Sequence, residues 1–134
     1  MKIKILAVLV AALITPLAGI AEVFTLSDGT VIEGEYVNDL EHGHWVFKSP
    51  DGTVIEGEYV NGQPHGNWVT KRKDGGAMEG PYVNGLEHGH WVVKAPGGEG
   101  MEGPYVNGQK HGRWVVTLPD GTVKEFLYVN GQLQ

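Results

Sequence analysis

The sequence predicts an all-β protein: a single antiparallel meander of repeated 23-residue β-hairpins, with about ten short strands, forming an elongated, twisted sheet. Three observations predict it. Tyrosine and tryptophan recur at a constant 23-residue spacing, segments with alternating side-chain character lie around them, and Asn-Gly or Asp-Gly pairs separate these segments. No segment after the first 21 residues shows the 3.6-residue apolar period of a helix, so we expect no helix there.

The aromatic residues set the repeat frame, which runs without insertion or deletion from Val23 onward. The units are 28–50, 51–73, 74–96 and 97–119, followed by a partial fifth unit, 120–134. Residues 23–27 align with the end of a preceding unit. Shortened units at both ends are typical of repeat arrays, because a terminal unit has only one neighbour.

The unit 51–73 illustrates the expected hairpin. Alternating β-branched and aromatic residues predict a first strand at 53–60, and Trp68 to Arg72 predicts a second. The segment 61–66 between them is rich in turn-forming residues. Asp74-Gly75 is then a tight turn into the next unit.

Alternation within the strands separates two faces of the sheet. Ile55, Tyr59 and Trp68, with their equivalents, are the expected core, and Gly57 lies between them so that a ring can cover bare backbone. The opposite face mixes valine with Glu and Lys and should be solvated. Pro81 and Pro104 lack a backbone N–H, which predicts a bulge or a missing hydrogen bond and the weakest pairing in units three and four.

Residues 1–21 have the pattern of a secretory signal peptide. Lys2 and Lys4 precede an uncharged apolar run, and Gly19 and Ala21 are small residues suited to cleavage after Ala21. The alternative is an uncleaved anchor, although the run is shorter than the roughly 20 residues of a membrane span. We therefore expect an exported repeat domain, 22–134, and the sequence leaves open whether it is periplasmic or secreted.

Composition narrows the function further. Without Lys2 and Lys4, 8 basic residues face 16 acidic ones, a net charge of about −8. This balance argues against nucleic acid as a partner and against electrostatic docking on anionic membranes. The chain has no cysteine, which rules out thiol catalysis, thiolate metal sites and a lipoprotein anchor.

The stretch 56–62, Glu-Gly-Glu-Tyr-Val-Asn-Gly, followed by His65-Gly66 and Trp68, resembles the MORN repeat. The resemblance extends over the whole domain and is closest to a bacterial variant with the pattern His-Gly-x-Trp. It departs from the family where the first aromatic is replaced by Ile32, Ile55, Met78 or Met101, and where a glycine is replaced by Trp. It implies a β-hairpin fold and a binding-scaffold role, and folds alone do not fix functions.

The polar residues that repeat do not form an evident reactive site. Histidines one unit apart are separated by two strand spacings, roughly 9–10 Å, too far to share a zinc ion, so the His-Gly pairs are interpreted as structural turns. The glutamates recur in every unit, whereas a catalytic carboxylate pair would break the symmetry. We therefore predict no catalytic, metal or cofactor site and no enzymatic activity.

The aromatic row is the remaining candidate. It is either the core itself or an open row that stacks on an extended ligand such as a glycan. Its members are Tyr36, Trp45, Tyr59, Trp68, Tyr82, Trp91, Tyr105 and Trp114.

Two functions stay open on this sequence. We favour a protein-interaction or structural scaffold, and the alternative is a module that binds polysaccharide or cell-envelope components. The free strand edges expected near Val23 and Val129 could also accept a strand from another chain, including a second copy.

Overall fold

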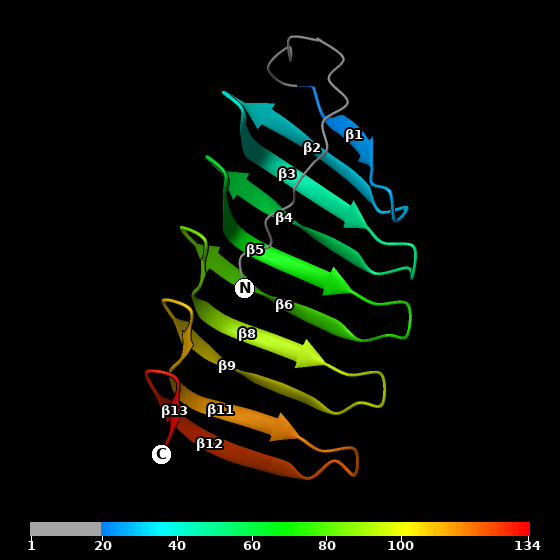
Figure 1. Ribbon diagram of the computed structural model, residues 1–134. Helices are drawn as coiled ribbons and strands as arrows, with labels where there is room; N and C mark the ends of the chain where they lie inside the picture. The colour runs from blue at the N-terminus through cyan, green and yellow to red at the C-terminus, as the bar shows by residue number, and fades with distance from the viewer. Residues whose placement is uncertain (1–19) are drawn as a thin grey trace.

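The computed structural model describes residues 20–134, which form one open antiparallel sheet without a helix (Figure 1). This confirms the predicted all-β meander. The proposed leader, 1–21, lies almost entirely outside the described residues. The sheet has 13 strands where about ten were expected, and their bounds are β1 (Glu22–Thr25), β2 (Val31–Val37), β3 (Leu40–Lys48), β4 (Val54–Val60), β5 (Gln63–Lys71), β6 (Ala77–Val83), β7 (Leu86–Glu87), β8 (Gly89–Lys94), β9 (Gly100–Val106), β10 (Gln109–Lys110), β11 (Gly112–Thr117), β12 (Val123–Val129) and β13 (Gln132–Leu133).

The tight turn of each hairpin is a two-residue pair alone, Asn38-Asp39 in unit one and Asn-Gly in the other units. Asn61 and Gly62 both have positive φ, 49° and 76°, as a two-residue type I′ turn requires. The second strand therefore begins at Gln63. The predicted turn over 61–66 and the predicted start at Trp68 are both wrong, because residues 63–65 pair with β4 and Gly66 pairs with β6.

The Asp-Gly pairs belong to longer connections between units. The Gly52 amide donates to the Ser49 carbonyl at 2.9 Å, and the Ser49 amide donates to Thr53 at 2.9 Å. The Asp51 carboxylate accepts the Thr53 amide at 2.8 Å. This backbone hydrogen bond lowers the pKa of Asp51 below its ordinary value. The Asp-Gly pair thus holds a wider turn than the tight hairpin that the sequence suggested.

The His-Gly pair lies at an irregularity within the second strand. In the β4–β5 ladder, Glu56 pairs with Val69 and Glu58 with His65, so two additional residues of β5 lie opposite Gly57. Gly66 supplies the positive φ, 69°, at this point. The shift by two residues keeps the alternation of faces, and it brings Trp68 opposite the glycine of the first strand.

The core is built from tryptophan rings that lie on glycine backbone. A Cβ atom at Gly57 would overlap the indole of Trp68, and Gly34, Gly80 and Gly103 have the same relation to the tryptophans of their units. The buried apolar residues of the described chain are Ile32, Trp45, Trp68, Trp91 and Trp114. The predicted core face is confirmed, and one tryptophan per hairpin is its centre.

Pro81 and Pro104 interrupt the hairpins of units three and four, as predicted. Six pairs join β4 to β5, whereas β6 forms three pairs with β8 and two with β7, and Pro81 has no partner in these ladders. The Pro81 carbonyl still accepts the His88 amide at 2.9 Å. The second strands are consequently divided at His88 and His111, which explains the larger number of strands.

The tryptophan–glycine contact can be tested with Gly57→Ala. We expect the free energy of unfolding in urea to fall by about 3 kcal/mol or more, the upper end for overpacking, because the new methyl group overlaps a rigid ring. Gly66→Ala is the matched control, since its Cβ meets nothing within 4 Å. It should cost only the backbone strain of a left-handed residue, about 1–2 kcal/mol. Equal losses in the two variants would contradict the packing explanation.

Unit four offers a stabilising change, because Gly97 stands where the other four units have the turn aspartate. Gly97→Asp should raise the free energy of unfolding by about 1 kcal/mol, through a carboxylate bond to the Glu99 amide and a less flexible unfolded chain. Gly97→Ala gives only the second contribution, about 0.4–1 kcal/mol. Urea titration of both variants measures the difference, and an alanine variant at least as stable as the aspartate one would exclude the turn bond.

Candidate functional site

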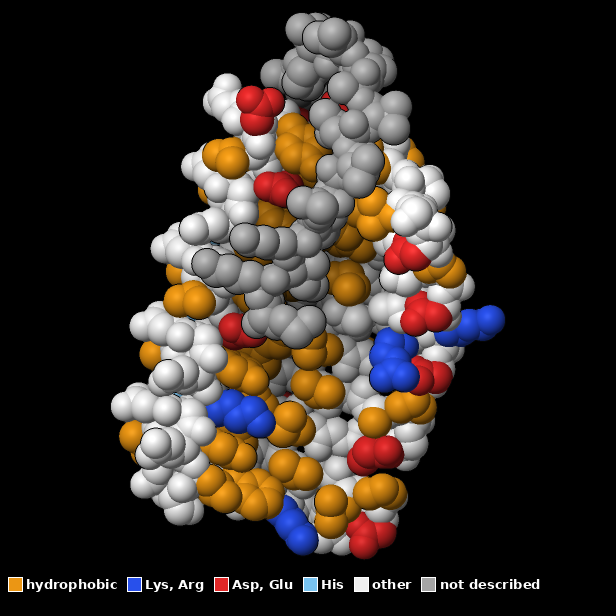
Figure 2. Space-filling view, in the orientation of Figure 1, with side chains coloured by type: hydrophobic (Ala, Val, Ile, Leu, Met, Phe, Trp, Pro, Cys, Tyr) orange, Lys and Arg blue, Asp and Glu red, His pale blue; other side chains and the backbone are white. Residues whose placement is uncertain are grey.

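The aromatic row forms a continuous stack along one face of the sheet, here called the aromatic face. Within a unit, Tyr59 and Trp68 meet edge to face, with ring centroids 5.1 Å apart and planes at 89°. Between units, Trp68 and Tyr82 meet in the same way at 6.1 Å. The stack begins at Phe24 against Tyr36 and ends at Tyr128 against Trp114. Figure 2 shows hydrophobic side chains along the length of this molecule.

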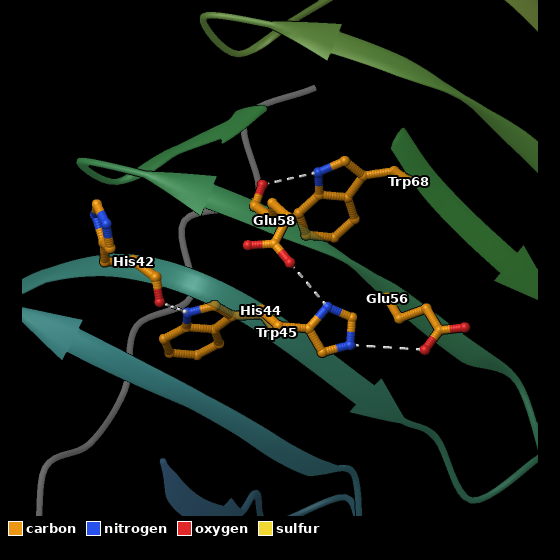
Figure 3. A network of polar contacts seen from close by, with 6 residues as sticks. All are labelled: His42, His44, Trp45, Glu56, Glu58 and Trp68. Atoms are coloured by element: carbon orange, nitrogen blue, oxygen red, sulfur yellow. Dashed lines mark hydrogen bonds and ion pairs between the residues drawn. The ribbon is translucent and has the colours of Figure 1, made fainter. Parts of the chain in front are cut away.

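The tryptophans of the row are structural. Their exposed fractions are 3% for Trp45, 8% for Trp68, 4% for Trp91 and 1% for Trp114. Each indole N–H donates to a carbonyl of the preceding strand, as Trp68 does to Glu58 at 3.1 Å (Figure 3). Burial and a satisfied N–H leave these rings little surface on which a ligand could stack.

The tyrosines of the row are half-buried and so form its accessible part. Burial raises the pKa of Tyr59, and the nearby carboxylate of Glu41 acts in the same direction. Burial likewise raises the pKa of Tyr82, with Glu87 as the second cause. Any ligand of the aromatic face would therefore meet tyrosine edges rather than indole faces.

One position beside the tyrosines varies from unit to unit. Tyr36 pairs with Glu41, Tyr59 with Pro64 and Tyr82 with Glu87, whereas Tyr105 pairs with Lys110. The Lys110 ammonium lies 4.4 Å from the Trp114 ring centroid, within cation–π distance. The aromatic face is thus acidic toward its N-terminal half and basic at its C-terminal end.

The opposite face, here called the charged face, carries cross-strand ion pairs. His44 lies between two carboxylates of β4, 3.7 Å from Glu56 and 3.3 Å from Glu58 (Figure 3). At the equivalent position, His90 is 2.9 Å from Glu102 and Arg113 is 2.8 Å from Glu125. All these side chains are at least one-third exposed, so each pair contributes little, about 0–1 kcal/mol.

Four of the six histidines take one of two structural roles. His44 and His90 contact the carboxylates just described, whereas the His88 ring lies within 3.5 Å of the Asn107 amide of the next unit. His111 has the same relation to Asn130 at 3.4 Å. Among residues 20–134, His, Cys, Asp and Glu form no group of three or more that could hold a metal ion.

A feature that the sequence analysis missed is a row of exposed apolar side chains at the Asn-Gly end of the charged face. Val60, Val83, Val106 and Val129 close the first strands, and each is 41% exposed. Leu40 and Leu86 lie opposite Val37 and Val83 across the hairpins and are 44% and 47% exposed. We call these six exposed residues the apolar ridge.

The signal for the ridge is present in the sequence. Every unit ends its first strand in Val-Asn, and the valines fall on the face that alternation assigns to solvent. A repeated valine on a solvated face is informative, because contiguous exposed apolar residues mark interaction sites more often than isolated ones do.

A shallow, open hollow lies near the turn between units three and four. It has a volume of about 300 Å³ and lies beside Gly100, between Val92, Lys94 and Val115. Gly100 stands where β4 has Val54, so a missing side chain accounts for the hollow. It offers no enclosed, convergent set of polar groups of the kind that a cofactor site provides.

A family model supports the interpretation of the repeat. The MORN repeat model matches residues 33–54, 56–76 and 102–123, and the chain belongs to the MORN repeat proteins. MORN repeats are non-enzymatic modules that generally mediate protein or membrane interactions. No curated protein matches the chain as a relative. Within the described part of the chain, no helix is long and apolar enough to cross a membrane.

The titration of the tyrosines should make the free energy of unfolding depend on pH in the alkaline range. The pKa values of four of them, Tyr36, Tyr59, Tyr82 and Tyr105, are raised above the ordinary value of 10.0 in the folded state, so the folded protein holds these protons more tightly than the unfolded chain does. This stabilisation is fully present below pH 10 and is lost as the pH rises through the folded-state pKa. Urea midpoints should therefore fall above pH 10, and Tyr59→Phe should reduce that fall. An unchanged alkaline slope in the variant would contradict it.

Proposed function

We propose that this protein is an exported, non-catalytic scaffold that binds another protein through the apolar ridge. The observation that carries the proposal is the regular exposure of Val60, Val83, Val106 and Val129, one residue in each successive unit. Residues one unit apart are separated by two strand spacings, about 9–10 Å. A row with this period presents several equal contacts to an extended partner, a geometry that suits repeat proteins.

The contacts around the ridge explain how it can stay exposed and ordered. Each leucine lies close to the glycine of the turn in the following unit. A Cβ atom added to Gly62 would lie 3.4 Å from the Leu40 side chain, and one added to Gly108 would lie 3.6 Å from the Leu86 side chain. Each leucine therefore lies beside a rigid Asn-Gly turn. Little side-chain freedom remains to be lost on binding, which favours affinity.

The alternative function is binding of polysaccharide or another envelope component on the aromatic face. The tyrosine edges and the acidic Glu41 and Glu87 favour it. The deep burial of the four tryptophans weighs against it, because aromatic stacking on sugars needs an open ring face. Protein binding is therefore the preferred function, and glycan binding is the second candidate.

Export is part of the proposal and rests on residues 1–21. The two lysines, the apolar run and the small residues Gly19 and Ala21 are the features of a cleavable leader. The first strand of the described sheet begins at Glu22, so cleavage after Ala21 would leave every strand intact. The intact mass of protein secreted by a host cell tests this, and a mass that includes residues 1–21 would refute cleavage.

The ridge can be tested with the double variant Leu40→Gln and Leu86→Gln. Units two, four and five already have glutamine at this position, so the fold should tolerate it and stability should change by less than about 0.5 kcal/mol. We expect a partner captured by crosslinking from the envelope fraction of the native cells to bind at least tenfold more weakly to the variant.

The matched control is Met78→Gln, a similarly exposed apolar residue on the aromatic face. Capture that survives Met78→Gln and fails in the ridge variant supports the ridge. The reverse pattern would move the binding site to the aromatic face and favour the alternative. A wild-type chain that retains glycans but no protein would reject the preferred function.

A further inference from the structure

The two ends of the sheet carry strand edges with unused backbone groups. Within residues 20–134, β1 pairs only with β2, and residues 123–127 of β12 pair in the ladders only with β11. The short β13 covers just the last two residues of β12. The Gln134 amide adds one bond, to the Leu127 carbonyl at 2.9 Å. Such edges are templates for a further strand.

The strands at the two ends correspond to complementary halves of one repeat element. In the 23-residue frame, β13 is the equivalent of β7 and β10, and β1 is the equivalent of Trp91–Lys94, the last four residues of β8. The second strands of units three and four are divided between these halves, at His88 and His111, and Gln134 falls on that same frame position. Placed end to end, β13 of one copy and β1 of the next would cover β12 with three frame positions between them, the first of which Gln134 fills.

The residues that depart from the repeat at the two ends also complement one another. On the aromatic face, Glu22 replaces the tryptophan of the second strand, and Phe126 replaces the glycine of the first strand. Within the array, the second strand of a unit provides the tryptophan ring and the glycine of the first strand provides the space for it. At a joint, Phe126 of the first strand would provide the ring, and the smaller Glu22 of the second strand would leave room for it.

The charges at the ends are opposite. Lys124 replaces the isoleucine or methionine of the other units, and it faces the same side as its cross-strand neighbour Val116. Glu22 lies on the aromatic face, where its charge contributes to the raised pKa of Tyr36. In the register of β2 with β3, these positions are diagonal neighbours, about 7–8 Å apart, which a lysine side chain can bridge.

We propose that this chain joins head to tail with second copies of itself, β12 of one copy pairing with β1 of the next. The register repeats that of the interior hairpins: Val123 lies opposite Thr25 of the second copy as Val31 lies opposite Lys48, and Lys124 lies opposite Phe24 as Ile32 lies opposite Phe47. Each joint completes a hairpin, so the sheet, the aromatic stack and the apolar ridge continue from copy to copy.

The joint rests on the removal of residues 1–21 proposed above. Residue 19 of the incoming copy and Gln134 of the first copy occupy the same frame position, so a retained leader would place two residues where there is room for one. Intact mass therefore accompanies every measurement. It separates a failure of cleavage from a failure of the joint, and neither result bears on binding by the ridge.

The test is a charge exchange with Lys124→Glu and Glu22→Lys. Each variant alone brings like charges together at every joint, Glu with Glu or Lys with Lys, and should associate at least tenfold more weakly than the wild type. An equimolar mixture restores an opposite pair at both possible joints, so alternating assemblies should form. Light scattering and sedimentation of the cleaved proteins at low salt measure the mass distribution.

Each outcome decides the proposal. Concentration-dependent growth of the wild type, its loss in both variants and its return in the mixture support the joint. A wild-type protein that stays monomeric would overturn the proposal. Lys124 would then be interpreted as a charge that prevents other strands from pairing with the β12 edge. Growth that only Lys124→Glu alters would indicate pairing of two C-terminal edges instead. A mixture that does not recover, or purified protein that retains residues 1–21, would also reject the proposal.

Discussion

The fold depends on one contact, the tryptophan ring that lies on the backbone of a glycine in the neighbouring strand. A single sheet has no second layer against which to bury its apolar face. In this protein the large rings are buried against the backbone of the sheet itself. Removing one side chain, at Gly57, makes room for the largest one, Trp68, within the thickness of a single layer. The indole N–H then satisfies the Glu58 carbonyl, so this burial leaves no polar group of the ring unpaired.

The other repeated residues follow from that contact. The ring reaches its glycine because two additional residues of the second strand are accommodated at the His-Gly position, where Gly66 has a positive φ. The tyrosine of the first strand then packs edge to face on the ring, at a distance typical of favourable aromatic pairs. The same ring meets the tyrosine of the next unit, which turns separate hairpins into a cooperative stack. Stability of this kind is a sum over nearest neighbours.

Much of this could be predicted from the sequence, because period and alternation are local properties. The 23-residue frame, the two faces, the role of Gly57 and the disturbance at Pro81 all follow from residue types at fixed spacings. The position of the turn could not be predicted in this way, because His65-Gly66 has turn-forming residues whether the chain reverses there or forms a bulge. Only the pairing of β5 with β4 distinguishes the two, and that pairing is a long-range property.

The candidate sites show the same division. Alternation placed the tryptophans and tyrosines on one face, but it could not show that the four indoles are buried while the tyrosines remain half-exposed, because burial depends on how closely each ring approaches the glycine backbone. Likewise, alternation assigned the valines of the apolar ridge to the solvated face, but it could not show that they are all exposed to the same degree. Their exposure is informative only because the pairing of successive hairpins in the sheet brings them into one row.

A chain in which every unit satisfies the same packing rule has few positions left for specificity. Residues that must recur, such as Trp68 and Gly57, cannot differ between units, so partner choice must lie in positions that the packing does not constrain. The position beside each tyrosine is one of these, and it changes from Glu41 to Pro64, Glu87 and Lys110 along the aromatic face. The leucine position of the apolar ridge is another. The ends are a third, since Glu22 and Phe126 break the tryptophan–glycine rule where no neighbour within the described chain enforces it. Function in this architecture is therefore expected at exceptions to the repeat rather than at its invariant residues.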